Sequence, residues 1–187
     1  MMGLKQVLEQ RTRKLILIDG SGSIAPIWRA TWKVIYHIMA RLRQPLGITI
    51  FYAWYYIDKQ YLIGELDNAR IYDAGRILFE KFKQREGLFR LREEPPEPPL
   101  IFTGGTPLFN AIQFVVEQFP ERQIIVITDG YENMSSRTEL PQTDKVFIIF
   151  VYHPEGDEYE RKMKEKLKAT YPHIEVTNEK DLERILF

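Results

Sequence analysis

Residues 15–23 read LILIDGSGS, so that four aliphatic residues lead directly into an aspartate, after which glycine and serine alternate. An apolar run without polar alternation is typical of a strand that is covered on both faces, as in a parallel sheet. Polar residues that directly follow such a strand lie at the carboxyl edge of the sheet, where α/β proteins bind their ligands. The stretch therefore predicts an α/β fold with a site for a phosphate group or a metal ion at residues 19–23.

Three further apolar runs follow along the chain, and segments with a helical period of 3.6 residues lie between them. The runs are Ile48–Trp54, Ile124–Ile127 and Val146–Val151, and the helical segments are residues 27–42, 71–82, 108–119 and 159–167. This alternation predicts parallel pairing through right-handed crossovers. We expect a three-layer, doubly wound, mostly parallel six-stranded sheet of the Rossmann-like kind.

One pair of strands is expected to depart from the parallel pattern. The segment Tyr61–Leu66 follows the strand at 48–57 after a link that is too short for a crossover helix, which predicts an antiparallel edge strand. A short strand near Ile174–Val176 and a terminal helix at Glu179–Leu186 complete the expected elements.

The amino-acid composition favours a single folded domain and disfavours several kinds of binding site. The chain has 187 residues, 44% hydrophobic and 28% charged, which suits a single domain over residues 1–187 with a proline-rich surface loop at 87–99. Lys and Arg number 26, as do Asp and Glu, so the net charge gives no general attraction to nucleic acid or to an anionic membrane. Cys is absent and His occurs three times, which disfavours thiolate and zinc sites. The sequence shows neither a membrane span nor a secretory signal, so we expect a cytoplasmic protein.

A phosphate site at the opening stretch is the weaker interpretation. Gly20, Gly22 and Ala25 match the dinucleotide-binding pattern G-x-G-x-x-A, but Asp19 lies directly before them, where its charge opposes a pyrophosphate. The phosphate loop G-x-x-x-x-G-K-[ST] is absent from the sequence. A serine-hydrolase elbow is disfavoured as well, because neither Ser21 nor Ser23 has a glycine two residues away on both sides.

A metal site uses more of the sequence. Asp19, Ser21 and Ser23 offer three oxygen atoms on one turn, and oxygen ligands are those that Mg²⁺ prefers. Two other stretches are expected at the same edge: FTGGTPLFNAI at 102–112 and IIVITDGYEN at 124–133. Loops after adjacent central strands meet in a doubly wound sheet, so we expect Asp19 and Asp129 to converge.

These three stretches together resemble the von Willebrand factor A domain family, whose metal-ion-dependent adhesion site has the pattern D-x-S-x-S, then a Thr in a glycine-rich loop, then an Asp after the next central strand. The matching positions are Asp19, Ser21, Ser23, Thr106 and Asp129. The resemblance implies that these residues bind Mg²⁺, or Mn²⁺ or Ca²⁺, directly or through water. It also implies a protein-binding module rather than an enzyme, in which the cation captures a carboxylate of a protein partner.

Four residues near these positions are candidates for a rim that faces the partner: Trp28, Phe109, Tyr131 and Glu132. Aromatic side chains anchor many interfaces, but packing between a helix and the sheet explains Trp28 and Phe109 equally well. Glu132 either approaches the metal or faces solvent.

Two rival functions remain open at this point. One is a metal-free structural or assembly subunit, in which the serine-rich turn only caps a helix. The other is a hydrolase that uses the metal to activate water, for which Glu132 and His153 are the available general bases.

Overall fold

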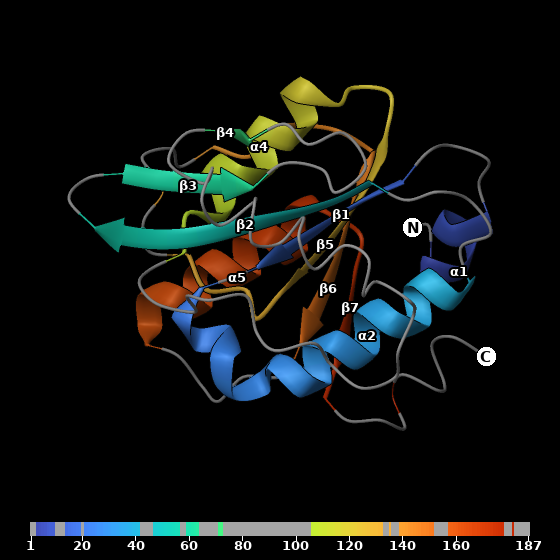
Figure 1. Cartoon of the computed structure of the whole chain (residues 1–187), viewed down its shortest axis with the longest axis horizontal. Coiled ribbons are helices and arrows are strands. Elements are labelled where there is room, and N and C mark those ends of the chain that lie inside the picture. Colours follow the sequence, from blue (N-terminus) through green and yellow to red (C-terminus); the bar gives the residue numbers. More distant parts are fainter. Residues whose placement is uncertain are drawn as a thin grey trace.

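The computed structural model describes residues 3–9, 14–19, 21–41, 47–56, 59–63, 71–72, 106–132, 135, 139–151, 157–177 and 181. Its centre is a sheet with the strand order β4-β3-β2-β1-β5-β6-β7 (Figure 1). The strands β1 (Lys14–Asp19), β5 (Gln123–Thr128), β6 (Val146–Val151) and β7 (His173–Val176) form a four-stranded, all-parallel part of this sheet. The parallel α/β arrangement predicted from the apolar runs is therefore confirmed, and it is consistent with a Rossmann-like fold.

The other half of the sheet contains the predicted hairpin. The strand β2 (Gly47–Tyr56) is parallel to β1, and β3 (Lys59–Ile63) pairs antiparallel with β2. A two-residue strand, β4 (Ile71–Tyr72), pairs antiparallel with β3. The expected count of six strands is therefore wrong, since β4 is a seventh, and the antiparallel strand β3 lies inside the sheet rather than at its edge.

Several expectations fall partly or wholly outside the described residues. A helix was expected at 71–82, but its first two residues form β4, so the prediction is wrong there. The rest of this segment lies outside the described residues. The proline-rich segment 87–99 also lies outside the described residues, as does the terminal helix at 179–186 except for Asp181, which is helical.

Three of the described helices follow predicted segments closely: α2 (Trp28–Arg41), α4 (Leu108–Gln118) and α5 (Glu158–Thr170). The helix α1 (Leu4–Glu9) and the 3-10 helix η1 (Gly22–Ile27) were not predicted. The helix α5 begins with a capping box, in which the Asp157 carboxylate accepts from the Glu160 N–H and the Glu160 carboxylate accepts from the Asp157 N–H. Among the described helices none has the length and apolarity needed to cross a membrane.

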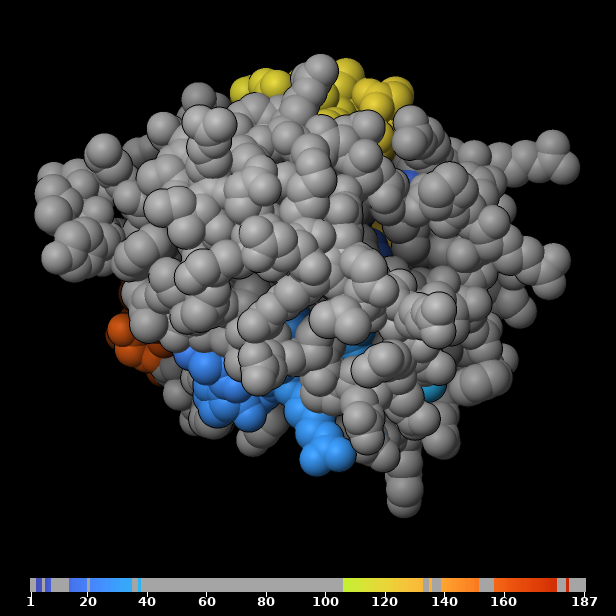
Figure 2. Space-filling view, in the orientation of Figure 1, coloured from blue at the N-terminus to red at the C-terminus, as the bar shows by residue number. Residues whose placement is uncertain are grey.

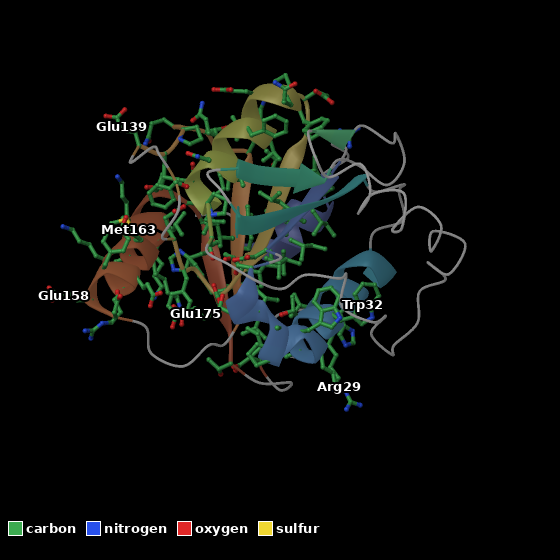
Figure 3. The ribbon with its side chains drawn as sticks, turned by 60° about the vertical axis from the view of Figure 1, so that its left-hand side comes forward. Arg29, Trp32, Glu139, Glu158, Met163 and Glu175 are labelled. Carbon is green, nitrogen blue, oxygen red and sulfur yellow. The ribbon has the colours of Figure 1, made fainter. Side chains whose placement is uncertain are left out.

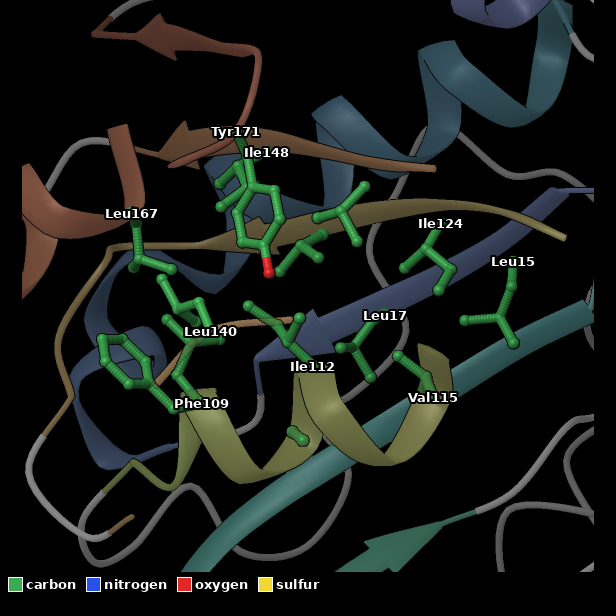
Figure 4. Packing of buried hydrophobic residues seen from close by; sticks show 14 of the residues in the cluster. Leu15, Leu17, Phe109, Ile112, Val115, Ile124, Leu140, Ile148, Leu167 and Tyr171 are labelled. Carbon is green, nitrogen blue, oxygen red and sulfur yellow. The ribbon is translucent and has the colours of Figure 1, made fainter. Parts of the chain in front are cut away.

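The central strands are buried on both faces, as their uninterrupted apolar sequences require. Leu15 and Leu17 belong to the cluster that contains residues of α4 and α5, whereas Ile16 and Ile18 point to the opposite face and are equally buried. Figure 4 shows Leu17, Ile112 and Val115 packed between α4 and the strands.

The polar faces of the helices point outward. Atoms of η1 and α2 reach the surface along the lower part of Figure 2, and atoms of α4 reach it at the top. Arg29 and Glu158 extend away from the body of the protein in Figure 3, and both are exposed. The strands β1, β5 and β6 are thus covered on both faces, while polar residues lie at their carboxyl ends.

Candidate metal centre

The ends of β1 and β5 are joined by a buried hydrogen bond. These strands are parallel neighbours, and Ile18 pairs with Ile127, so Asp19 and Thr128 come next in register. The Thr128 hydroxyl donates to Asp19 Oδ2 over 2.6 Å, and both residues are fully buried. The carboxylate of Asp19 is thereby held at the carboxyl edge of the sheet, where the sequence predicted it.

The turn after Asp19 brings the two serines to the same place. Asp19 Oδ1 accepts from the Ser21 N–H over 2.9 Å, which bends the chain directly after β1. The hydroxyl oxygens of Ser21 and Ser23 are then 3.0 Å apart and share a hydrogen bond. Ser21 is buried and Ser23 is half-buried. The structure therefore gathers the first three predicted ligands, Asp19, Ser21 and Ser23, on one turn.

The turn after β5 repeats this design with Asp129. Its Oδ1 atom accepts from the Tyr131 N–H over 3.1 Å, and the Gly130 N–H donates to the Thr128 hydroxyl over 3.0 Å. Gly130 has φ +90°, a conformation that side chains disfavour. A Cβ atom at this position would lie 2.9 Å from a ring carbon of Phe150 and 3.0 Å from Lys164 Cγ. Glycine is therefore required here by the backbone and by the close approach of β6 and α5.

The two aspartates repel each other electrostatically. Burial raises the pKa of Asp19 to about 7, and the nearby charge of Asp129 raises it as well. Hydrogen bonds from Thr128 and Ser21 act in the opposite direction, because they stabilise the charged form. A positive charge beside the two carboxylates, whether a proton or a cation, is thus favoured at this edge.

Lys164 of α5 interacts electrostatically with Asp129. Lys164 is partly buried, and its Nζ atom is 5.0 Å from the centre of the Phe150 ring. Burial lowers the pKa of Lys164, while Glu175 and Asp129 favour its charged form. The protein itself therefore places one positive charge near Asp129.

Thr106 lies buried at the junction before Pro107 and α4. The preceding residues of its glycine-rich loop, 103–105, are outside the described part of the chain. The position of Thr106 is set by the start of α4, and that start is in turn bound to the loop that carries Asp129.

Glu132 makes this connection. Its Oε2 atom accepts from the Phe109 N–H over 2.6 Å and from the Ser135 hydroxyl over 2.6 Å, while Oε1 accepts from the Ser135 N–H over 2.7 Å. The Ser135 hydroxyl also accepts from the Asn110 N–H over 3.0 Å. Pro107, at the N-cap of α4, has no side chain that can cap the helix, so Glu132 and Ser135 do this from another loop.

The four residues proposed for a partner-facing rim are interior. The exposed fractions of Trp28, Phe109, Tyr131 and Glu132 are 6, 1, 9 and 2%. Trp28 packs against Trp32 with ring centroids 5.9 Å apart, and Phe109 belongs to the core cluster. The prediction of a rim made of these residues is therefore wrong in this structure, because their side chains turn inward. The carboxylate of Glu132, which was expected at the metal or in solvent, caps α4 instead.

The donor set at this edge fits a hard divalent cation. Asp19 and Asp129 supply two carboxylates, and Ser21 and Ser23 supply hydroxyls of the kind that Mg²⁺ accepts. Each carboxylate oxygen can accept more than one contact, so the hydrogen bonds already made leave lone pairs for a cation. Within the described ranges no three His, Cys, Asp or Glu side chains form a metal site by themselves, so the hydroxyls are essential to the fit.

Three residues that matter here were not predicted from the sequence: Thr128, Ser135 and Lys164. Thr128 could have been found, because a hydroxyl at the end of an aliphatic strand needs a buried partner. Ser135 carries no such signal, since its partner Asn110 is 25 residues away. Lys164 is one of many charged residues on α5, and its electrostatic interaction with Asp129, which depends on the fold, distinguishes it.

Comparison with known proteins adds no relative to this picture. No family model matches the sequence, and no curated protein matches it significantly.

Proposed function

We propose that this protein is a von Willebrand factor A-type domain, doubly wound in three layers, that binds Mg²⁺, Mn²⁺ or Ca²⁺ and captures a carboxylate of a protein partner. Asp19, Ser21, Ser23, Thr106 and Asp129 would hold the ion. The observation that carries this proposal is the pair of buried, mutually repelling aspartates at the ends of neighbouring parallel strands, with two hydroxyls on the adjoining turn.

Burial of two carboxylates at one place is costly unless their charge is compensated. Lys164 contributes one positive charge in the vicinity, and the pKa of Asp19 is nevertheless raised. The protein maintains this arrangement with three hydrogen bonds that orient the carboxylates, from Ser21, Thr128 and Tyr131. Orientation of a costly pair of charges is typical of a site that binds a cation.

The roles of the side chains follow from their charge. Asp19 and Asp129 supply negative charge, whereas Ser21, Ser23 and Thr106 supply neutral oxygens. Thr128 and the Ser21 N–H fix the rotation of the Asp19 carboxylate. A bound divalent ion would supply a coordination position for an additional carboxylate oxygen. That additional oxygen is what a partner protein would contribute.

The main rival is a metal-free structural subunit. One observation favours it: both oxygens of Asp19 accept hydrogen bonds from within the chain. With a pKa of about 7, a proton on Asp19 could take the place of the cation. The second rival, a metal-dependent hydrolase, needs a general base. Glu132 is unsuited to this role, because its carboxylate accepts three hydrogen bonds within the protein. The other possible base, His153, lies outside the described residues.

Calorimetric titration of the chelator-treated protein with Mg²⁺ and with Mn²⁺ separates these functions. We expect saturable binding by the wild type and none by the double variant Asp19→Ala, Ser21→Ala. The control is Asp144→Ala, which removes an exposed carboxylate just before β6, at the opposite edge of the sheet. Absence of binding and of a thermal shift in the wild type contradicts the metal site and supports the structural subunit.

Partner capture is a separate test. Affinity capture from native lysate, with and without chelator, is expected to recover a partner only in the presence of the divalent ion. If the double variant recovers the same partner in chelator, the capture mechanism is wrong even where the wild type binds the ion.

A further inference from the structure

Two loops that carry candidate metal ligands are linked by two side chains, the buried Glu132 and the half-buried Ser135. Asp129 lies three residues before Glu132, and Thr106 lies three residues before Phe109, whose N–H donates to the Glu132 carboxylate. Ser135 completes the link, since its hydroxyl donates to Glu132 and accepts from the Asn110 N–H. Glu132 is 2% exposed, so water competes little for these hydrogen bonds.

We propose that Glu132 and Ser135 are positioning residues which couple the Asp129 loop to the start of α4, so that Asp129 and Thr106 are held at the metal site as one unit. This inference deepens the proposed function, and it rests on that function for its metal-binding readout. The coupling itself is a property of the protein without metal.

The chemistry of the link explains why these two side chains are needed. The first turn of a helix has N–H groups that lack partners within the helix, and a negative group is favoured there. A local cap, such as Asp157 before α5, would satisfy them without contact to another loop. In α4 the acceptors are the side chains of Glu132 and Ser135, which are 23 and 25 positions away from the N–H groups that they cap. The hydrogen bonds that cap α4 therefore also hold the loop that follows Asp129.

The test variants remove hydrogen-bonding atoms from Glu132 or from Ser135. Glu132→Gln keeps the shape but retains one acceptor oxygen, and its amide nitrogen cannot accept from the N–H of Ser135 or Phe109. Ser135→Ala removes the hydroxyl, whereas Ser135→Thr keeps it and serves as the conservative rescue. Asp157→Ala is the control, because it also removes a carboxylate that caps a helix, but this cap is local to α5 and contacts no second loop.

The first readout is the Mn²⁺ affinity of the folded protein. We expect Glu132→Gln and Ser135→Ala to weaken it by about tenfold, the range found for residues that orient metal ligands. Ser135→Thr and Asp157→Ala are expected to bind within about twofold of the wild type. A purely structural role would lower the stability of all cap variants and leave the affinity of the folded protein unchanged. Wild-type affinity in both Glu132→Gln and Ser135→Ala therefore overturns the proposal.

The second readout needs no metal. Amide hydrogen exchange in chelator is expected to become faster, in Glu132→Gln and in Ser135→Ala, both at Phe109 and Asn110 and at Gly130 and Tyr131. Asp157→Ala is expected to affect only the first turn of α5. If exchange changes on one loop alone, the loops are not coupled and the proposal is overturned. If the wild type binds no Mn²⁺, the proposed function fails, and this measurement alone decides the coupling.

Discussion

The hydroxyl of Thr128 lies 2.6 Å from Oδ2 of Asp19, although the two residues are 109 positions apart in the chain. The same hydroxyl accepts from the Gly130 N–H over 3.0 Å. One oxygen atom therefore connects the end of β1, the end of β5 and the turn that carries Asp129. Its loss is expected to disturb both aspartates at once.

Replacement of Thr128 by Val, which has nearly the same shape, tests this connection. The variant removes a donor to a buried carboxylate and an acceptor of a backbone N–H, so we expect a loss of about 2–3 kcal/mol in the free energy of unfolding. Thr128→Ser keeps the hydroxyl and should lose only about 1 kcal/mol for the missing methyl group. Urea denaturation of both variants gives the comparison, and equal losses would mean that the hydroxyl contributes little.

Gly130→Ala tests the requirement for glycine after Asp129. The new methyl group would meet the Phe150 ring at 2.9 Å, and the backbone has φ +90°. Strain and overpacking together predict a loss of about 2–4 kcal/mol in the free energy of unfolding. Gly3→Ala is the control, since a methyl group there meets nothing within 4 Å, and it should change stability by less than about 0.5 kcal/mol. A small effect at Gly130 would show that the turn can rearrange.

The stability of the metal-free protein should fall as the pH rises from about 4 to 7. The pKa of Asp19 is about 7 in the folded state, compared with an ordinary value of 3.8. The folded protein therefore binds a proton in this range that the unfolded chain releases, and linkage makes the folded state less stable as that proton is lost. The contribution of this group is complete below the lower pKa and absent above the higher one, with a total on the order of 4 kcal/mol.

Asp19→Asn removes this titrating group, and the difference between the two proteins reports its effect. Urea unfolding in chelator at several pH values should show a slope of stability against pH that is more negative for the wild type than for the variant. At pH 8, addition of Mg²⁺ is expected to raise the free energy of unfolding of the wild type and to leave that of Asp19→Asn unchanged. Identical slopes in the two proteins would contradict a raised pKa at Asp19.

Lys164→Met should strengthen the binding of a divalent cation. Lys164 interacts electrostatically with Asp129, so its charge opposes a cation at the same carboxylate. Lys164 is only partly buried, so solvent screens its charge, and we expect its removal to raise the affinity by about two- to fivefold, or roughly 0.5–1 kcal/mol.

Lys168→Met is the matched control for that change. Lys168 also lies over the Phe150 ring, at 5.9 Å, but it forms an ion pair with Glu175 over 2.5 Å. Calorimetric titration with Mn²⁺ should show a gain for the first variant and little change for the second. Equal effects would indicate that the total charge matters rather than the position of Lys164.

The parallel strands could be predicted from sequence because their composition leaves few alternatives. Runs such as Leu15–Ile18 have no polar face, so both faces must be covered, and this occurs mainly in parallel sheets. The strand β4 could not be predicted in this way. Two residues have no measurable period, and Ile71 also fits a helical spacing with Ala74.

The candidate site was predictable in its positions but not in its contacts. Asp19 and Asp129 follow strand ends, and strand order alone brings such residues together. The direction of a side chain depends on packing, which explains why Phe109, at the start of α4, and Tyr131, after β5, are interior despite their nearness in sequence to Thr106 and Asp129. The capping role of Glu132 depends on a helix 23 residues earlier, and no local pattern reveals it.

The central place of β1 has a consequence for how the chain folds. Leu15 pairs with Gly47 on one side and with Ile124 on the other, so β1 is synthesised early but gains its second neighbour only when β5 has been made. Contacts between such distant residues form slowly, because a long loop must close before they become favourable. Until then an apolar strand edge stays open to other chains. The interval between the synthesis of β1 and that of β5 is therefore a stage at which the chain is exposed to aggregation.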